Sequence, residues 1–182
     1  MAAPEATLAE VSGAQPFVIT RVVDAPRGLV WRLFTEAEHL KRWFGPKGFT
    51  MPSCTLDLRP GGIFHYQLRA PDGAEIWGKW LFKEIVPPER LVTVVSFSDA
   101  QLGTTRHPWA ADWPLETLGT TELAEQGDKT LITVTWTPYQ PTPAEAAAFE
   151  AGRDSMRQGW TGTLEQLVAY LATMAEGGEK PG

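Results

Sequence analysis

The sequence predicts an α+β fold with a curved antiparallel sheet of about six strands and a long C-terminal helix. Three observations predict it. Short β-branched runs alternate with tight turns between residues 54 and 137, which is typical of an antiparallel meander. Residues 27–43 have helical spacing and follow a first strand, which indicates two short helices. Residues 143–174 carry one apolar stripe at helical spacing, which predicts an amphipathic helix lying on the sheet.

The N-terminal elements are predicted from their capping residues. A β-branched strand ends at Asp24, which is expected to cap a helix over about 27–34 with Pro26 in its first turn. Thr35 is the expected cap of a second short helix over 36–43. This part of the chain is therefore expected to run strand, helix, helix.

The rest of the sheet is predicted from apolar runs that turn residues separate. The expected strands are 54–58, 63–69, 75–86, 91–98, 115–123 and 130–137. Asp72-Gly73 is a strong hairpin signal between two of them. No periodic pattern occupies the connection over residues 99–114, so no strand is expected there.

The C-terminal helix is expected to begin with Thr142 as its cap and Pro143 at its first position, and to break near Gly152. Its apolar stripe consists of Phe149, Met156, Trp160, Leu164, Leu167, Leu171 and Met174. Gly152 and Gly159 lie at the edge of that stripe, where they are expected to leave room.

Arg153 falls within the apolar stripe, where a charge needs a partner or solvent. One interpretation pairs it with Glu75 or another strand carboxylate. A second makes it a charged anchor facing a ligand-sized cavity. A third is a side chain whose stem packs on apolar surface while its charge reaches solvent.

A cavity is expected because one helix cannot fully cover a broad twisted sheet. The candidate ligand-binding residues are Phe64, Tyr66, Leu68, Trp80, Trp136, Arg153, Met156 and Trp160; each is also consistent with plain core packing. Alternation in the 63–69 strand places His65 on the opposite face, toward solvent. Whether Trp77 or Trp80 faces inward stays open.

The connection over residues 99–114 is unusually long for a loop in a compact domain, and such loops are often lids. It carries His107, Trp109 and Trp113, a possible lid. Because a tryptophan has a large apolar area, three roles are open. The two tryptophans cap a pocket mouth, cover an apolar sheet edge, or meet a second subunit in a homodimer.

Composition excludes several classes of protein. The chain has 16 Lys and Arg against 22 Asp and Glu and a net charge of −6, so nucleic acid is not an expected partner. The single cysteine, Cys54, is expected to be a small core residue and permits no disulfide within the chain. The three histidines lack ligand spacing, so no metal or cofactor is expected, and His39 is expected at the surface.

The expected organisation is one domain over residues 16–174 between disordered tails at 1–15 and 175–182. No apolar run is long enough to span a membrane, and no secretory signal is recognisable. A cytoplasmic location is therefore expected. No catalytic triad, nucleophile elbow or phosphate loop occurs, so catalytic residues are unknown and enzymatic activity is left open.

Several stretches together resemble the activator of heat-shock-protein-90 ATPase homologue-like family of the START-like (SRPBCC) superfamily. They are Val23-Asp24-Ala25-Pro26, residues 38–46 (EHLKRWFGP), residues 57–62 (DLRPGG), Pro71-Asp72-Gly73, residues 84–91 (EIVPPERL), residues 129–134 (KTLITV) and Gly159-Trp160. The resemblance implies a helix-grip fold, in which the sheet wraps around the C-terminal helix and leaves a cavity between them.

The resemblance does not imply one chemistry, because a fold does not fix a function. Three functions are consistent with it. The first is binding of a small hydrophobic or aromatic molecule in the cavity. The second is a protein-interaction role like that of a co-chaperone, with a chaperone ATPase as the partner. The third is a polyketide cyclase- or dehydratase-like enzyme, in which Tyr66 or Arg153 polarises a carbonyl.

Overall fold

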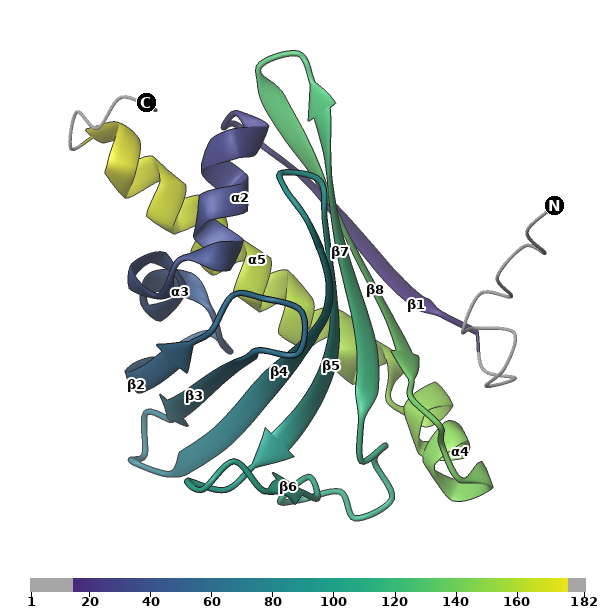
Figure 1. Cartoon of the computed structure of the whole chain (residues 1–182). Coiled ribbons are helices and arrows are strands. Elements are labelled where there is room, and N and C mark those ends of the chain that lie inside the picture. Colours follow the sequence, from purple (N-terminus) through teal and green to yellow (C-terminus); the bar gives the residue numbers. More distant parts are fainter. Residues whose placement is uncertain (1–14, 177–182) are drawn as a thin grey trace, which may run out of the picture.

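A computed structural model describes residues 15–176, and its elements follow the predicted order (Figure 1). The N-terminal elements are β1 (Phe17–Val23), α2 (Arg27–Thr35) and α3 (Ala37–Trp43). The strands that follow are β2 (Thr50–Leu56), β3 (Ile63–Arg69), β4 (Glu75–Val86), β5 (Arg90–Ser98), β6 (Thr104–Thr105), β7 (Thr117–Gln126) and β8 (Lys129–Pro138). The C-terminal helices are α4 (Pro143–Ala151) and α5 (Arg153–Glu176).

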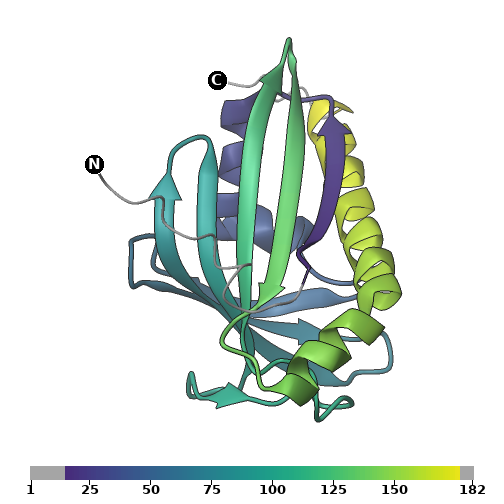
Figure 2. The same cartoon turned by 90° about the vertical axis from the view of Figure 1, so that its right-hand side faces the viewer.

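The strands form one antiparallel sheet in the order β1-β8-β7-β5-β4-β3-β2, with β6 paired to the end of β5. The described sheet has eight strands, more than the predicted six or so. The strand β6 lies in the connection where none is expected, because a two-residue strand leaves no periodic pattern. Figures 1 and 2 show that the sheet curves and that α2, α3 and α5 lie on its concave face.

Two glycines on the concave face make room for aromatic rings across the sheet. Gly78 in β4 pairs with Tyr66 in β3, and Gly119 in β7 pairs with Trp136 in β8. A Cβ built on Gly78 lies 2.5 Å from the Tyr66 hydroxyl oxygen, and one built on Gly119 lies 3.1 Å from Nε1 of Trp136. The absence of a side chain at each glycine therefore gives the aromatic ring of the cross-strand residue the space it needs.

The C-terminal helices confirm the predicted cap and break. The Thr142 side chain accepts a hydrogen bond from the backbone N–H of Glu145, and Pro143 occupies the first turn. Gly152 separates α4 from α5. The helix α5 continues to Glu176, two residues beyond the predicted end.

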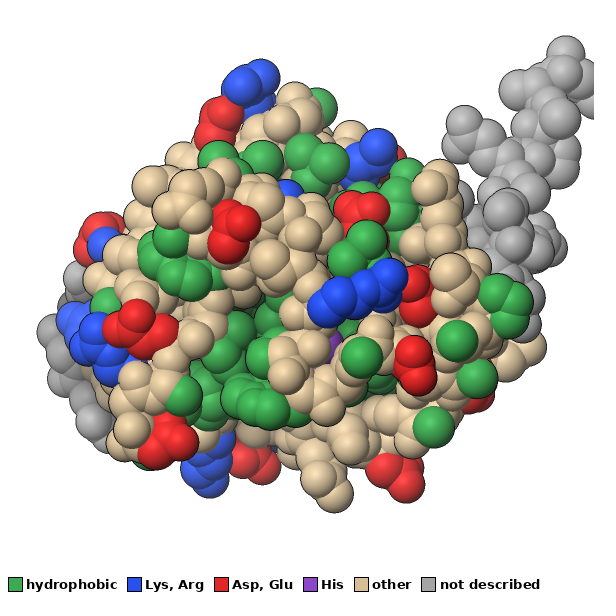
Figure 3. All heavy atoms as spheres, turned by 90° about the horizontal axis from the view of Figure 1, so that it is seen from below, with side chains coloured by type: hydrophobic (Ala, Val, Ile, Leu, Met, Phe, Trp, Pro, Cys, Tyr) green, Lys and Arg blue, Asp and Glu red, His purple; other side chains and the backbone are tan. Residues whose placement is uncertain are grey.

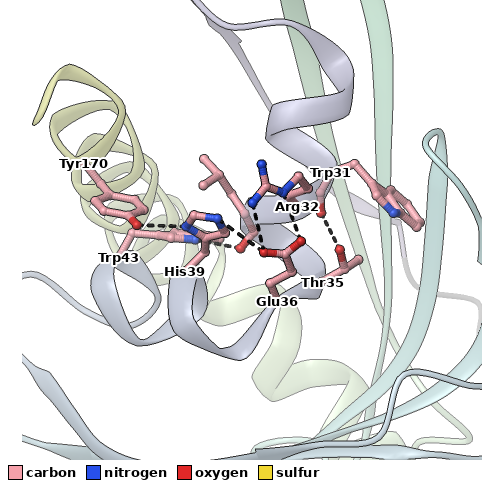
Figure 4. Close-up of polar contacts among 8 residues, drawn as sticks. Trp31, Arg32, Thr35, Glu36, His39, Trp43 and Tyr170 are labelled. Carbon is pink, nitrogen blue, oxygen red and sulfur yellow. Dashed lines mark hydrogen bonds and ion pairs between the residues drawn. The ribbon is translucent and has the colours of Figure 1, made fainter. Parts of the chain in front are cut away.

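The caps predicted for the two short helices are wrong. Pro26, rather than Asp24, is the N-cap of α2, because the extended backbone reaches Pro26 and leaves Asp24 two residues before the cap. Glu36, rather than Thr35, is the N-cap of α3. The Thr35 hydroxyl instead donates to the carbonyl oxygen of Trp31 inside α2 (Figure 4).

Fully buried side chains gather between α2, α3, the C-terminal half of α5 (from residue 164) and the sheet. They include Leu33, Phe34, Trp43, Leu164 and Leu167. The Phe34 and Trp43 rings meet edge to face at 4.9 Å, and the Trp43 indole N–H donates to the carbonyl oxygen of Leu33 at 2.9 Å. The interior here is closed by packing and by satisfied polar groups.

His39 is not the surface residue that the sequence pattern predicts. Its side chain is only 13% exposed. Its Nδ1 lies 2.8 Å from the Tyr170 hydroxyl of α5, and its Nε2 lies 3.4 Å from a Glu36 carboxylate oxygen (Figure 4). The ring joins α3 to α5, a contact across 131 residues that local periodicity does not reveal.

The predicted tails fall mostly outside the described residues. Of the predicted tail residues, Gln15, Ala175 and Glu176 are described, and the last two continue α5. No helix in the described part of the chain is long and apolar enough to cross a membrane.

Candidate ligand-binding site

A cavity of about 700 Å³ lies between the concave face of the sheet, the first turns of α5 and the connection that carries β6. Figure 3 views the molecule from the end that carries β6, where hydrophobic side chains gather in a hollow. The lining includes Trp80, Trp109, Trp113, Trp136 and Trp160. None of the described lining residues is Asp, Glu, Lys or Arg. The cavity is an apolar, largely aromatic space within the size range of small-ligand sites.

The structure brings six of the eight predicted cavity residues together around this space. They are Tyr66, Leu68, Trp80, Trp136, Met156 and Trp160. The strand residues point inward because side chains alternate between the faces of a sheet, and the helix residues are four apart and share one helix face.

Trp80 is the inward-facing tryptophan of β4. Its ring lies 5.0 Å from Phe64 and 4.9 Å from Phe44, inside the concave face. The Trp77 ring instead stacks on His65 at 4.8 Å. Trp80 is therefore the one that joins the inner aromatic core, while both tryptophans border the cavity.

Phe64 lies beneath the cavity wall rather than in it. Its side chain is fully buried. It packs against Phe44, Tyr66 and Trp80 at 6.2, 4.9 and 5.0 Å between ring centroids. Phe64 therefore supports the aromatic wall from behind and does not line the cavity.

Arg153 does not line the cavity, and it is not paired with Glu75. Its Nε donates to a Glu150 carboxylate oxygen at 2.8 Å, which lowers the pKa of that carboxyl group. Its guanidinium also donates to the carbonyl oxygens of Pro16 and Gln15. Glu75 pairs with Arg69. Arg153 thus fastens the start of β1 to α5, and the role of a cavity anchor is excluded by this geometry.

The three predicted lid residues all border the cavity. Trp113 packs on Phe149 of α4, with 5.7 Å between ring centroids. His107 lies between the rings of Phe97, Trp109 and Trp113. Trp109 is 71% exposed. The two tryptophans of the connection therefore differ: Trp113 packs against α4, whereas Trp109 borders the cavity and is largely exposed to solvent.

A polar contact holds the connection to α4. An Arg106 guanidinium nitrogen lies 2.8 Å from a Glu145 carboxylate oxygen, and the Glu145 side chain is only 7% exposed. The same nitrogen donates to the carbonyl oxygen of Trp113 at 3.4 Å. Because a buried carboxylate without a partner is costly, this ion pair favours the position in which Trp113 covers one side of the cavity.

Two glycines of the α5 region behave differently toward the cavity. A Cβ on Gly152 would lie 2.7 Å from the Trp113 ring, so that glycine makes room for the connection. A Cβ on Gly159 would meet no atom within 4 Å, although Gly159 lines the cavity. The space left at Gly159 is therefore open.

Tyr66 is the one tyrosine among the described lining residues, and it is 7% exposed. Burial raises the pKa of its hydroxyl well above the ordinary value, and a hydrogen bond with the Trp80 side chain opposes that rise. Burial also lowers the pKa of His107. Both groups are therefore held in their neutral forms.

His65 lies on the face opposite the cavity, as alternation predicts, but it is buried rather than exposed to solvent. Its Nε2 lies 3.0 Å from both the Ser98 hydroxyl and the carbonyl oxygen of Asp99, and Trp77 covers its ring. Cys54 packs half-buried against the core, and burial raises the pKa of its thiol. No cluster of metal-ligating side chains occurs among residues 15–176.

Several lining residues escape the sequence pattern. Phe44 and Phe49 reach the cavity from the segment between α3 and β2, and Thr163 reaches it from α5. The Thr163 hydroxyl donates to the carbonyl oxygens of Gly45 and Gly159. These residues sit in an irregular segment or on the polar side of the helical stripe, so periodicity does not identify them.

Comparison with known proteins identifies the family. Residues 24–172 match the family described as activator of Hsp90 ATPase homolog 1-like protein. No curated protein matches the chain. The solution structure of a protein from Arthrobacter aurescens has a TM-score of 0.71 and 26% identity, over 89% of this chain and 88% of that chain.

Two crystal structures give the same picture. A protein from Nitrosomonas europaea has a TM-score of 0.68 and 26% identity, over 88% of this chain and 96% of that chain. The AHSA1 protein from Silicibacter pomeroyi has a TM-score of 0.68 and 15% identity, over 87% and 99%. The last likeness shows the fold alone, whereas the family match spans most of the sequence. The chain therefore belongs to the activator of Hsp90 ATPase homolog 1-like family of the SRPBCC superfamily.

Proposed function

We propose that the chain binds a small hydrophobic molecule in the cavity between the sheet and α5. The observation that carries the proposal is an apolar cavity of about 700 Å³. Gly159 lines this cavity, and the space beside its Cα is unfilled. Ligand sites commonly have volumes of about 300–1,000 Å³ and mostly apolar walls with few polar groups.

Packing physics supports a functional reason for the cavity. Protein interiors contain few voids larger than a water molecule, because unfilled space forfeits dispersion contacts. The other half of the same α5–sheet interface is filled by Leu164 and Leu167, which are 2% and 0% exposed. The chain fills one half of the α5–sheet interface with side chains and leaves a cavity in the other half. This difference supports a ligand-binding role for the cavity.

A protein-interaction role is the second candidate, and one observation favours it. Trp109 is 71% exposed and Leu102, in the same connection, is 45% exposed. The family description concerns activation of the Hsp90 ATPase, so a chaperone partner is the natural choice to test. A homodimer through this connection and a cytoplasmic location stay predictions.

An enzymatic role needs at least two polar groups that converge on a substrate. Tyr66 and His107 both line the cavity and both have shifted pKa values. They make a cyclase- or dehydratase-like activity the third candidate, to be tested once a ligand is known.

The test is a titration with N-phenyl-1-naphthylamine, an uncharged dye that fluoresces in apolar sites. The wild-type chain is expected to enhance its fluorescence saturably. Gly159→Leu is expected to abolish the enhancement, because the new side chain occupies the open space. Gly162→Leu is the matched control on the same helix, since Gly162 lies outside the cavity and its Cβ would meet only Lys47, at 3.7 Å.

Two outcomes contradict the proposal. One is a folded wild-type protein that leaves the dye fluorescence unchanged. The other is equal dye binding by the Gly159→Leu and Gly162→Leu variants, which would place the dye elsewhere on the molecule. Circular dichroism of each variant establishes that a lost signal does not come from a lost fold.

A further inference from the structure

The charge of the cavity wall restricts what can bind. None of the described residues that line it carries a carboxylate, an ammonium or a guanidinium group. Cationic side chains of the surrounding elements have other partners: Arg106 contacts Glu145, Arg153 contacts Glu150, and Lys79 donates to the carbonyl oxygen of Leu102. An ionised ligand would therefore lose its hydration without gaining a counter-ion.

The arrangement of the rings indicates the shape of the ligand. Trp136 of the sheet meets Trp160 of α5 edge to face at 5.5 Å. Phe44 meets Tyr66 and Trp80 edge to face at 5.2 and 4.9 Å. Ring faces and ring edges therefore border the same space from the sheet and from the helix. Such walls favour a flat aromatic molecule, which stacks on faces and accepts edge contacts.

Tyr66 supplies a polar group with a free proton. Its side chain is 7% exposed and lines the cavity. Its ring packs among Phe44, Phe64 and Trp80, with centroid distances of 5.2, 4.9 and 6.5 Å. The Tyr66 hydroxyl donates no hydrogen bond to another residue in the described part of the chain. Because Tyr66 borders the cavity, a ligand oxygen there can accept the proton of its hydroxyl.

We propose that the ligand is an uncharged aromatic ring compound that carries a hydrogen-bond acceptor, and that the Tyr66 hydroxyl donates to this acceptor. This inference rests on the proposed function and narrows it. Aromatic ketones and aldehydes have the required chemistry. Aromatic carboxylates are excluded by their charge, and pure hydrocarbons leave the Tyr66 proton without a partner.

Three naphthalenes of similar size separate these cases. They are 2-acetylnaphthalene, which is neutral with an acceptor, 2-isopropylnaphthalene, which is neutral without one, and 2-naphthoate, which is anionic. Each competes with N-phenyl-1-naphthylamine at neutral pH. The ketone is expected to displace the dye about fivefold better than the hydrocarbon, the effect of one hydrogen bond. It is expected to exceed the carboxylate about tenfold or more.

Tyr66→Phe tests the role of the hydroxyl because it removes one oxygen and keeps the ring. In this variant the ketone is expected to lose its advantage over the hydrocarbon, while the dye still binds. Tyr139→Phe is the matched control, since Tyr139 lies outside the cavity, and it is expected to keep the wild-type order. Thermal melts of both variants verify that they are folded.

The outcomes separate this inference from the proposed function. If the dye does not bind at all, the proposed function itself fails. If the dye binds but the naphthoate displaces it as well as the ketone does, the neutral-ligand inference is overturned. If Tyr66→Phe keeps the full preference for the ketone, Tyr66 is not the donor and the inference is overturned as well.

Discussion

The two halves of α5 face the same sheet and have opposite surroundings. The C-terminal half presents Leu164 and Leu167, which are 2% and 0% exposed and pack in the dense core with α2 and α3. The N-terminal half presents Ser155 and Gly159 to the cavity, with Met156 and Trp160 beside them. Small residues on one half and leucines on the other thus divide a single helix–sheet interface into a ligand-sized space and a core.

This difference shows how one helix can carry stability and a candidate site together. The Tyr170–His39 contact joins the C-terminal half of α5 to α3, and the Trp43 hydrogen bond in turn joins α3 to α2. The N-terminal half of α5 can border a cavity because these contacts of the C-terminal half already attach the helix to the rest of the domain. Changes in the C-terminal half are therefore expected to affect stability, and changes in the N-terminal half to affect binding.

The largest expected effect contrasts Leu167→Ala with Met156→Ala. Leu167→Ala removes a fully buried side chain from the filled half and is expected to cost about 3 kcal/mol of unfolding free energy. Met156→Ala is expected to cost about 1 kcal/mol, because Met156 already borders unfilled space. Urea unfolding measures both. Equal costs would contradict the division of α5 into two halves.

Gly78→Ala is expected to cost about 2 kcal/mol, because the added methyl group would lie 2.5–2.7 Å from the Tyr66 ring and hydroxyl. The ring must then move toward the cavity, so dye affinity is also expected to fall. The control is the same substitution in a Tyr66→Ala background, where the steric cost should disappear. An additive double variant would show that Tyr66 does not fill the space at Gly78.

Gly159→Ala is expected to stabilise the protein by about 1 kcal/mol, because alanine favours the helix and its methyl group enters open space. Gly152→Ala is the opposing case, since its methyl group would strike Trp113 at 2.7 Å. Thermal unfolding compares them. A loss of stability in Gly159→Ala would mean that the space beside it is filled.

The smallest effect concerns pH. Burial lowers the pKa of His107, so the unfolded chain binds a proton more readily than the folded chain. The stabilising contribution of neutral His107 is complete above the pKa of about 6.5 that histidine has in the unfolded chain. It is lost as the pH falls toward the lower pKa of His107 in the folded protein. Between about pH 7.5 and about pH 5, wild type should lose slightly more stability in urea than His107→Asn. Equal losses would show that His107 does not titrate differently on folding.

Much of the fold follows from local patterns. The Thr142 cap, the break at Gly152 and the Asp72-Gly73 hairpin are encoded within a few residues, and the structure confirms them. Alternation along β3 and helical spacing along α5 also place Tyr66 and Met156 at the same cavity. Local patterns were sufficient for these features because each depends on residues that are close together in the sequence.

The remaining features depend on contacts between distant segments. Arg153 donates hydrogen bonds to the carbonyl oxygens of Pro16 and Gln15, which are 137 and 138 residues away in the sequence. His65 is buried by Trp77 and by the end of β5, although its strand pattern predicts exposure. Whether an inward residue lines a cavity or fills a core depends on what lies opposite, as Phe64 and Tyr66 show. Local sequence does not carry that information.

A ¹H–¹⁵N correlation NMR titration with 2-acetylnaphthalene tests most directly whether the N-terminal half of α5 is a ligand site. The expected result is saturable shifts in the amide signals of residues 152–163 and of β3 and β4 around Tyr66 and Trp80. The signals of residues 164–174 should stay in place. Shifts confined to the C-terminal half of α5, or no saturable shifts in a folded protein, would contradict the proposed site.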